Sequence, residues 1–315
     1  MKNKILFFLE KECGSFVSGA EIAKKLGISR MAVCKEIKAL RELGIEIQSS
    51  PKNGYRLTHP SDILCRESVS AHLPNGRHID VFCYDCVRST NEIAKQMAAS
   101  ASHGTLIAAN EQTNGRGRYG RSFFSPAGSG IYMSVIIKPS CLREGVMYTV
   151  AAAVAARKVI QSISEEPAKI KWVNDIYIGE RKVCGILCEA VSELETGELC
   201  AVICGIGINI TAPEGGFPDE IKDKASAVTK QKISRARLAA DITDTLLTVL
   251  EGDDESLIKE YTEHMMLIDR EIYYRKNNTL QSGTVTGIDG TGGLIVKSGE
   301  DTEILRSGEV QLERF

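Results

Sequence analysis

The sequence has few of the features that mark secreted or membrane proteins. No apolar run is long enough to cross a bilayer, and the short run Ile5–Leu9 is followed by Glu10, Lys11 and Glu12 rather than by a small-residue cleavage pattern. The formal net charge is only −2, so the chain as a whole is not strongly basic or acidic. We therefore expect a cytoplasmic protein with reduced thiols and no membrane partner.

The cysteines lack the pattern of a common metal site. There are ten cysteines, and Cys83 and Cys86 form a C-x-x-C pair, but no second pair stands at the spacing that a zinc site needs. The remaining pairs have a wider spacing within apolar, strand-like runs: Cys184 with Cys188, and Cys200 with Cys204. We interpret all six as buried structural cysteines, and we assign no metal-ligating residue.

The length of the chain and the distribution of its charge indicate more than one domain. Its 315 residues are enough for two or three domains. The first 65 residues carry 11 basic and 7 acidic side chains, whereas the rest of the chain carries 28 and 34. A basic module on an acidic body predicts a polyanionic partner for the module alone. We expect an α+β multidomain protein with boundaries at 1–64, 65–265 and 266–315.

Residues 1–58 predict a winged helix-turn-helix. Ser18 and Glu21 have the capping-box spacing, Gly27 ends that helix, and Ser29 caps the next one. A hairpin with its turn at 51–54 follows as the wing. The pattern predicts DNA binding with the helix from Ser29 in the major groove, and a module used only for protein contact is the alternative. The residues expected to contact DNA are Ser18, Ser29, Arg30, Lys35, Lys38, Lys52 and Arg56, with Arg41 on the same helix face.

The rest of the chain predicts two further architectures. Residues 65–265 alternate strand and helix patterns, which indicates an α/β domain with a mixed sheet. Within it, Thr211–Lys232 is rich in proline, glycine and charge, so we expect a mobile loop of the kind that covers a site. Thr58–Leu64 is a predicted linker. Residues 266–315 contain short strands separated by glycines, as in a small SH3-like β-barrel.

The stretch that points most directly to chemistry is Gly115-Arg116-Gly117-Arg118-Tyr119-Gly120-Arg121, here called the arginine loop (residues 115–121). Glycine lets a ligand approach the main chain, and the arginine fork suits carboxylate and phosphate oxygens. A flexible basic segment that binds nucleic acid is the alternative. Because apolar, strand-like segments lie on both sides, we interpret the loop as an anion-binding loop of an enzyme domain.

Other polar patches accompany the arginine loop. Ser89-Thr90-Asn91 lies at a predicted helix start, and Gln112 directly precedes the loop. Lys171-Trp172-Val173-Asn174-Asp175 places a cation, an amide and a carboxylate at a strand end, and a hairpin could direct Lys182 to the same pocket. Gly205-Ile206-Gly207-Ile208-Asn209 ends a strand with room for a base or ribose. Trp172, the only tryptophan, is more typical of a core than of an adenine platform.

Together these segments resemble the family of bifunctional biotin–protein ligases and biotin-operon repressors. The matching pieces are STN at 89–91, GRGRYGR at 115–121, KWVND at 171–175, RKVCGIL at 181–187 and GIGINI at 205–210. With the winged helix, the resemblance covers essentially the whole chain. It implies that biotin and ATP, with Mg²⁺ carried by ATP, form biotinyl-5′-AMP, and that biotin then passes to a lysine of the biotin carboxyl carrier protein of acetyl-CoA carboxylase. It also implies a biotinyl-AMP-bound homodimer on biotin operator DNA.

The resemblance implies roles for named residues. Contacts to biotin or biotinyl-AMP fall to Ser89, Thr90, Asn91, Gln112, Gly115, Arg116, Gly117, Arg118 and Lys182. Contacts to ATP and its phosphates fall to Arg121, Phe123, Lys171, Asn174, Asp175 and Asn209. The catalytic set is Arg116, Lys182 and Asp175.

The sequence departs from the family pattern at two of these segments. Phe123 stands where the family usually has tryptophan, and Val173 stands where KWPND has proline; no C-terminal arginine is assigned to ATP. Two alternatives remain open. One is a repressor that senses biotin but catalyses weakly or not at all, and the other is a related ligase that adenylates lipoate or another carboxylate.

Overall fold

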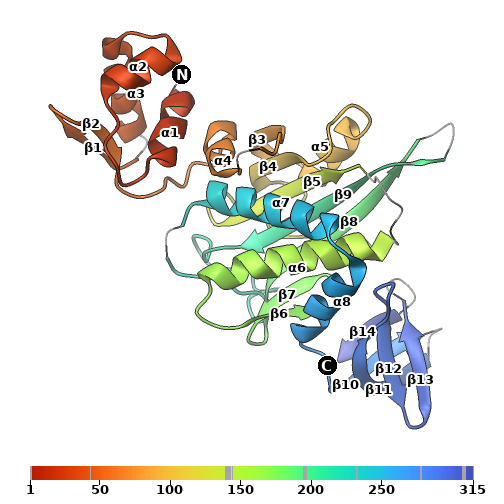
Figure 1. The fold of residues 1–315 in the computed structure, drawn as a ribbon. Coiled ribbons are helices and arrows are strands. Elements are labelled where there is room, and N and C mark those ends of the chain that lie inside the picture. Colours follow the sequence, from red (N-terminus) through yellow and green to blue (C-terminus); the bar gives the residue numbers. More distant parts are fainter. Residues whose placement is uncertain are drawn as a thin grey trace.

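The computed structural model describes residues 2–42, 44–74, 76–138, 143, 145–193, 197–231, 233–276, 279–306 and 310–314. In chain order these residues form a small helical module with a hairpin, a central seven-stranded sheet covered by helices, and a five-stranded antiparallel sheet. The N-terminal module and the C-terminal sheet lie at opposite ends of the central sheet (Figure 1). The predicted α+β class with a mixed central sheet is confirmed.

The N-terminal module is a winged helix-turn-helix, as its capping residues predict. It consists of α1 (Lys2–Lys11), α2 (Gly19–Leu26), α3 (Arg30–Glu42), β1 (Ile47–Ser50) and β2 (Gly54–Leu57). The Ser18 hydroxyl accepts from the Glu21 N–H at 3.0 Å, and Gly27 ends α2 with a left-handed φ of 64°. The Glu21 carboxylate pairs with Lys25 at 2.8 Å. Ser29 accepts from the Ala32 N–H at 3.1 Å at the start of α3.

A buried apolar cluster joins the helices of this module to its wing. Its members come from all three helices and both strands, and they include Ile5, Leu9, Ile22, Val33, Ile37, Leu40 and Leu57. Arg41 fixes α3 to the wing, because its guanidinium donates to the Ile47 carbonyl at 2.6 and 2.9 Å. Arg41 is exposed, as predicted, but part of its guanidinium already bonds the backbone of β1.

The segment after the wing contains a helix that the sequence did not predict. Helix α4 (Arg66–His72) follows the predicted linker and packs between α1 and the body. Inside this contact, the Glu10 carboxylate accepts hydrogen bonds from the Ser61 and Ser68 hydroxyls, each at 2.6 Å. Burial raises the pKa of Glu10, although both serine hydrogen bonds oppose that shift. The linker is therefore partly built into the body.

The central sheet has the order β3-β4-β5-β9-β8-β7-β6. Only β3 and β4 are parallel, and the other neighbours are antiparallel. The strands are β3 (Val81–Val87), β4 (Thr105–Gln112), β5 (Gly130–Ile137), β6 (Ala168–Lys171), β7 (Asp175–Ile178), β8 (Arg181–Ser192) and β9 (Leu199–Asn209).

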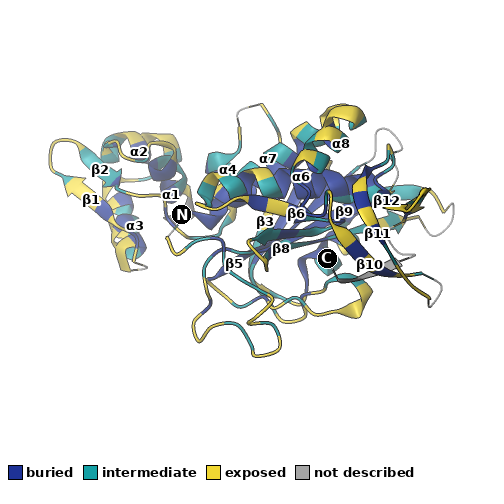
Figure 2. Cartoon of the chain, turned by 90° about the horizontal axis from the view of Figure 1, so that it is seen from below, coloured by how far each residue is buried: buried dark blue, intermediate teal, exposed yellow. Residues whose placement is uncertain are grey.

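Helices cover both faces of this sheet. Helices α6 (Gly145–Ile163), α7 (Arg235–Glu251) and α8 (Asp254–Glu263) share the main core, whereas α5 (Thr90–Met97) packs Ala94 against the other face. Figure 2 shows buried residues concentrated in the sheet and in α6 and α7. By length and composition α6 could cross a membrane, contrary to our expectation from the sequence, but 67% of its apolar window is buried inside the protein.

The predicted lid segment is fastened to the sheet at its second half. The Lys182 N–H donates to the Lys224 carbonyl at 2.8 Å, and the Ser226 N–H donates to the Lys182 carbonyl at 2.9 Å. The Val228 N–H donates to the Asn209 carbonyl at 2.9 Å. Lys232 lies outside the described residues. These hydrogen bonds connect the segment to the N-terminal end of β8 and to the C-terminal end of β9.

The C-terminal sheet has the order β13-β12-β11-β10-β14. Its strands are β10 (Glu271–Lys276), β11 (Thr279–Ile288), β12 (Leu294–Ser298), β13 (Asp301–Leu305) and β14 (Val310–Arg314). All described pairings are antiparallel, and closure into an SH3-like barrel stays a prediction. The buried faces of this sheet and of the central sheet belong to one continuous core.

The cysteine interpretation is partly wrong. Cys184 and Cys204 are buried, as predicted, but Cys86 is exposed and Cys83, Cys188 and Cys200 are only partly buried. Within the described residues, no group of three or more His, Cys, Asp or Glu side chains could hold a metal ion. The C-x-x-C spacing falls on an edge strand, where alternation places its two cysteines on different sides.

Candidate active site

One cavity, of about 200 Å³, collects most of the polar patches predicted from the sequence. Its walls come from the start of α5, the arginine loop, the turn before β7, and the middle of β8 and β9. Twelve of the predicted site residues line it: Ser89, Thr90, Asn91, Gln112, Arg116, Gly117, Arg118, Arg121, Phe123, Asn174, Asp175 and Lys182. Gly115, Lys171 and Asn209 do not. Segments more than 80 residues apart therefore meet at one place.

The arginine loop is a compact turn held by its own backbone. The Gly117 N–H donates to the Arg121 carbonyl at 2.7 Å, and the Phe123 N–H donates to the Gly115 carbonyl at 2.8 Å. Gly115 is buried, and a Cβ there would lie 2.6 Å from the Ser125 hydroxyl, so no larger residue fits. Tyr119 takes a left-handed φ of 56° at the tip of the turn. Gly115 thus shapes the loop from beneath, outside the cavity wall.

The arginines of the loop make polar contacts with neighbouring elements. Arg116 pairs with Glu92 of α5 at 3.0 Å, and Arg118 donates to the Asn174 amide oxygen at 3.4 Å. Glu92 also lies 3.8 Å from Arg88. Sequence reasoning missed Glu92, whose position four residues after Arg88 gave only the signal of a helical ion pair. Arg116 is expected to grip an anion, and here a protein carboxylate occupies that place.

A chain of hydrogen bonds forms the floor of the cavity. The Gln112 amide oxygen accepts from the Thr90 N–H at 2.9 Å, and the Gln112 amide donates to Ser125 at 3.0 Å. The Ser134 hydroxyl lies 2.8 Å from the Thr90 hydroxyl and donates to the Asn91 amide oxygen at 2.6 Å. Ser134 comes from β5 and was missed, because its neighbours in sequence are entirely apolar.

Asn91 is held on both sides of its amide. Its Nδ2 donates to Glu189 at 2.8 Å and to the Leu187 carbonyl at 3.1 Å, while Ser134 bonds its oxygen. These contacts use both donors of the Asn91 amide. Asn91 also lines the cavity, and its contact with biotin stays a prediction. Ser89 differs, since its side chain makes no capping bond at the start of α5 and lines the cavity.

The glycines of β8 and β9 make room for side chains of the protein. A Cβ on Gly207 would lie 2.6 Å from the Phe123 ring, and a Cβ on Gly205 would lie 2.8 Å from the Asn91 amide carbon. A Cβ on Gly185 would lie 3.1 Å from Lys182. We expected Gly205 and Gly207 to leave space for a base or ribose. In this structure that space holds Asn91 and Phe123.

A charged cluster lies on the β7 side of the cavity. The hairpin directs Lys182 into the cavity, as predicted, and there Lys182 pairs with the Asp175 carboxylate at 2.7 Å. Burial, with Lys182 and Arg121 nearby, lowers the pKa of Lys171 to about 8, although Asp175 opposes the shift. Lys171 lies 5.5 Å from the centre of the Tyr177 ring. Cations thus surround one partly buried carboxylate, an arrangement suited to an incoming polyanion.

Two predicted ligand residues donate hydrogen bonds from their side-chain amides to backbone carbonyls. The Asn174 amide donates to the Ile186 carbonyl at 2.8 Å, and the Asn209 amide donates to the Ser226 carbonyl at 3.3 Å. Asn209 thereby secures the lid segment to β9. The placement of Asn209 outside the cavity wall follows from this bond.

The turn between β6 and β7 is anchored from behind. Trp172 is 7% exposed and donates from its indole to the Gly292 carbonyl of the C-terminal sheet at 3.1 Å. Tyr261 of α8 donates to the Val173 carbonyl at 3.1 Å. The interpretation of Trp172 as a core residue is confirmed. Val173 is itself buried, so packing fixes the turn that proline fixes in the family pattern.

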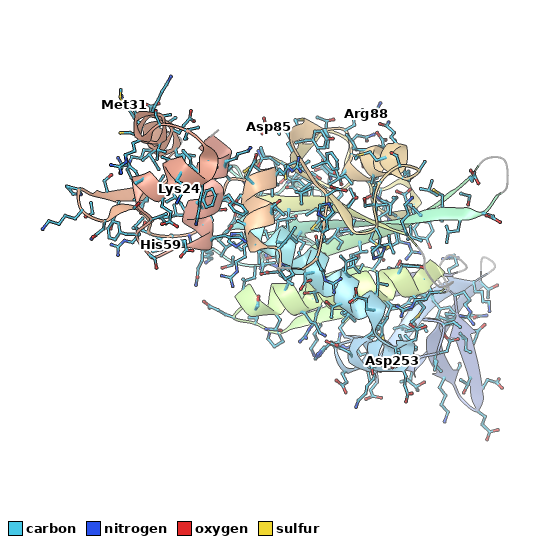
Figure 3. The ribbon with its side chains drawn as sticks, turned by 45° about the horizontal axis from the view of Figure 1, so that its top comes forward. Lys24, Met31, His59, Asp85, Arg88 and Asp253 are labelled. Carbon is cyan, nitrogen blue, oxygen red and sulfur yellow. The ribbon has the colours of Figure 1, made fainter. Side chains whose placement is uncertain are left out.

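The winged helix exposes a basic face away from the cavity. Arg30, Lys35, Lys38 and Lys52 are exposed, whereas Ser18 and Ser29 use their hydroxyls as helix caps. Arg56 donates to Gln48 at 3.2 Å and stacks on Phe16, so it braces the wing below its tip. Met31 is 84% exposed at the start of α3 and points away from the body (Figure 3). Sequence reasoning did not single it out.

Three family descriptions match successive parts of the chain. A helix-turn-helix domain matches residues 2–56, the biotin/lipoate A/B protein ligase family matches residues 83–209, and the biotin protein ligase C-terminal domain matches residues 268–312.

Relatives of known name cover nearly all of the chain. The bifunctional ligase/repressor BirA of Bacillus spizizenii is 33% identical over 98% of both chains. BirA of Escherichia coli is 27% identical over 95% of this chain and 94% of its own. Among solved structures, the biotin protein ligase of Aquifex aeolicus in complex with biotin and ATP has a TM-score of 0.66 at 27% identity, and it covers 75% of this chain and 99% of that chain.

Proposed function

Because this chain belongs to the family of bifunctional biotin ligases and repressors, we propose that it activates biotin with ATP, transfers it to a carrier protein and represses biotin genes. The observation that carries the proposal is the cavity in which cationic side chains of the arginine loop and of β8 face one carboxylate. Several relatives of the chain are named as ligases for biotin, which favours biotin over lipoate.

The reaction joins two anions. An oxygen of the biotin carboxylate attacks the α-phosphorus of ATP, the bond to the β-phosphate bridge breaks, and pyrophosphate leaves. The ε-amine of an acceptor lysine then attacks the acyl carbon, loses a proton, and displaces AMP. Catalysis of this kind rests on positioning and charge neutralisation. Arg116, Arg118 and Lys182 would supply positive charge, and Asp175 would orient Lys182.

The polar floor suits the biotin half of the ligand. The ureido group of biotin has N–H donors and a carbonyl acceptor, and Ser89, Thr90 and Gln112 offer hydroxyl and amide partners beside apolar strand residues. Phe123 lines the same cavity with its ring against Gly207, and it would contact the nucleotide half. Arg121 and Lys171 would meet phosphate from the other side.

Mg²⁺ would enter with ATP. Asp175 is the only acidic side chain among the described residues that line the cavity. One carboxylate together with phosphate oxygens is a usual ligand set for Mg²⁺. The residue therefore fits a metal carried by the nucleotide, which would neutralise phosphate charge. Lys182 would have to share or release this carboxylate.

Repression places further requirements on the chain. The exposed residues Arg30, Lys35, Lys38 and Lys52 would contact the phosphates and grooves of a biotin operator. We propose a homodimer when biotinyl-AMP is bound, because an operator with two half-sites needs two winged helices. The carrier protein would be that of acetyl-CoA carboxylase. Both partners and the substrates are expected in the cytoplasm.

Incubation of the full chain with biotin, Mg²⁺, ATP and a biotin carboxyl carrier domain tests the ligase function. We expect mass spectrometry to show the carrier gaining one biotin, with pyrophosphate released. In Lys182→Met, removal of one charge-stabilising group should slow pyrophosphate release roughly 10²-fold. The matched control is Lys158→Met, since Lys158 pairs with Glu260 on the helical side, away from the cavity.

The same experiment separates the alternatives. Biotin-dependent DNA binding without pyrophosphate release would leave a sensor rather than a ligase. Pyrophosphate release that depends on lipoate and not on biotin would identify the related ligase. Either result contradicts the proposed function.

A further inference from the structure

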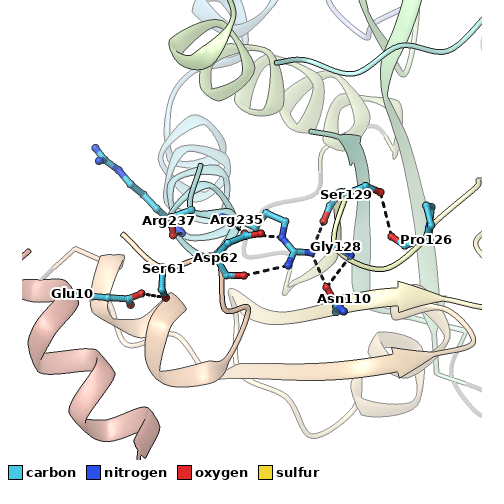
Figure 4. A network of polar contacts seen from close by, with 11 residues as sticks. Glu10, Ser61, Asp62, Asn110, Pro126, Gly128, Ser129, Arg235 and Arg237 are labelled. Atoms are coloured by element: carbon cyan, nitrogen blue, oxygen red, sulfur yellow. Dashed lines mark hydrogen bonds and ion pairs between the residues drawn. The ribbon is translucent and has the colours of Figure 1, made fainter. Parts of the chain in front are cut away.

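A buried arginine joins three parts of the chain that the reaction does not explain. Arg235, the first residue of α7, is 6% exposed, and its guanidinium bonds in two directions. On one edge, Nε donates to the Asp62 carboxylate at 2.8 Å and Nη2 donates to the Asp62 carbonyl at 3.2 Å. On the other edge, Nη1 donates to the Asn110 amide oxygen at 2.7 Å and to the Gly130 carbonyl at 3.3 Å (Figure 4).

The Asp62 edge leads to the DNA-binding module. Asp62 belongs to the linker after the wing, and the next contact along it is Ser61, which donates to Glu10 of α1 at 2.6 Å. Ser68 of α4 donates to the same carboxylate. The position of α1 relative to the body is therefore set by the linker that Arg235 holds (Figure 4).

The opposite edge leads to the arginine loop. Asn110 lies in β4, two residues before Gln112, and Gly130 begins β5, so Nη1 bonds both stems of the segment 113–129. The Asn110 amide oxygen also accepts from the Gly128 N–H at 3.2 Å. Any shift of these stems must move the atoms that Arg235 bonds.

The geometry suits transmission rather than simple anchoring. A planar guanidinium has its donors in a fixed fork, so displacement of one edge tilts the other. The Arg235 side chain is only 8% exposed, whereas the Asp62 carboxylate that contacts it is 48% exposed. Loss of the carboxylate would leave the buried Nε donor without its partner, which is costly for a buried polar group.

We propose that Arg235 is a positioning residue that couples order in the arginine loop to the position of the linker, and so to the winged helix. This inference rests on the proposed function, because an anionic ligand must first order the loop. Ligand binding then fixes the stems at Asn110 and Gly130. The guanidinium of Arg235 is thereby held in one orientation, and its bond to Asp62 holds the linker in one place. The two sites are coupled through one side chain, with reciprocal effects.

Hydrogen exchange of the full chain, measured by mass spectrometry with and without biotin plus ATP and Mg²⁺, tests the coupling. In the natural chain we expect the ligands to slow exchange at least threefold both in 113–129 and in 58–64. In Asp62→Asn the slowing of 113–129 should persist, and the slowing of 58–64 should disappear. Asp85→Asn is the matched control, because Asp85 is an exposed aspartate on β3 (Figure 3).

The outcomes distinguish this inference from the function beneath it. If 113–129 does not respond in the natural chain, the ligand does not order the loop and both proposals fail. If 113–129 responds but 58–64 does not, or if Asp62→Asn leaves the response of 58–64 intact, the coupling alone is refuted.

Arg235→Lys separates positioning from stability. Lysine keeps the charge but cannot bond both edges with a fork, so the stems lose their common support. We expect the KM for ATP to rise at least threefold with kcat within twofold of the natural value. A purely structural role would instead lower kcat through a smaller active fraction and leave KM unchanged, which would overturn the assignment.

Discussion

Two glycines on one strand should respond very differently to the same added methyl group. Gly205 and Gly207 lie two residues apart on β9, so their missing side chains face the same side of the sheet. A Cβ at 205 would lie 2.8 Å from the amide carbon of Asn91, and a Cβ at 207 would lie 2.6 Å from the Phe123 ring. We expect Gly205→Ala to destabilise the protein strongly and Gly207→Ala to do so weakly.

The difference follows from how firmly each neighbour is held. Asn91 would lose its bonds to Glu189, to the Leu187 carbonyl and to Ser134, which measure 2.8, 3.1 and 2.6 Å. With about 1 kcal/mol for each neutral bond and about 2 kcal/mol for the bond to the carboxylate, the full loss is about 4 kcal/mol. A small backbone shift in place of this loss costs about 1–3 kcal/mol. Because the cheaper of the two routes is taken, we expect a loss of about 1–3 kcal/mol.

At position 207 the clash involves the outer edge of a ring. The contacting atoms are Cε1 and Cζ of Phe123, and a partly exposed ring can rotate away from them. We expect Gly207→Ala to cost about 1 kcal/mol or less, within the range of ordinary substitutions outside a tight core. Because Phe123 would turn into the cavity, Gly207→Ala should instead weaken binding of biotin.

Calorimetry of both variants, with titration of biotin, measures these effects. For a folding unit of about 150–250 residues, 1 kcal/mol shifts Tm by about 2–4 °C, so Gly205→Ala should lower Tm by roughly 2–12 °C. Gly287→Ala is the control, since a Cβ there meets nothing within 4 Å. Equal shifts in Gly205→Ala and Gly207→Ala, or a shift below about 2 °C in Gly205→Ala, would refute the reasoning.

Three further predictions concern the edges of the site. Because burial lowers the pKa of Lys171 to about 8, affinity for ATP should fall as pH rises above 8, and Lys171→Arg should keep it level to pH 9.5 in a binding titration. Over the same pH range Lys171 is protonated in a larger fraction of unfolded chains than of folded chains. Lys171 should therefore make the free energy of unfolding of the natural chain rise with pH. In Glu92→Gln, Arg116 loses its carboxylate partner, so Glu92 no longer competes with the ligand for Arg116. Calorimetric titration should show biotinyl-AMP binding several-fold more tightly at low salt, and unchanged affinity would contradict this competition. In Trp172→Phe the bond to Gly292 is lost and a smaller ring fills the site, so denaturant unfolding should show a free energy of unfolding lower by at least about 1–3 kcal/mol. No loss would mean that the bond is replaced.

The parts of the fold that the sequence predicts are those set by local chemistry. Ser18, Gly27 and Ser29 delimit their helices because caps and left-handed glycines act within a few residues. The position of Lys182 in the cavity follows from a short antiparallel hairpin, in which the strand register leaves few positions open. The burial of Trp172 follows from its size and apolar character.

The parts that the sequence does not predict depend on partners far away in the chain. Helix α4 has only two buried apolar residues of its own, Val69 and Ala71, and it is fixed through Ser68 to Glu10 of another helix. Helix α8 was likewise missed, and its Tyr261 is placed by a carbonyl 88 residues away. No local pattern encodes such contacts.

The same distinction bears on the predicted ligand residues. The amides of Asn91 and Asn209 bond protein groups that are distant in sequence, Glu189 and the Ser226 carbonyl. A polar residue near a site has equal chemical reason to support the site or to touch the ligand. The ligand contacts of both residues therefore stay predictions.

The energies of these contacts also indicate which side of the cavity should move. The floor around Asn91 is buried and hydrogen-bonded throughout, so its rearrangement would leave polar groups unsatisfied. The pair of Arg116 with Glu92 is half exposed, at 53% and 29%, and such pairs are worth about 0–1 kcal/mol. A phosphate or carboxylate of the ligand that makes a charge-assisted bond of about 1.5–3 kcal/mol can therefore displace Glu92 from Arg116. The ligand should reorder the arginine loop over a fixed floor, which is the motion that the stems at Asn110 and Gly130 would pass to Arg235.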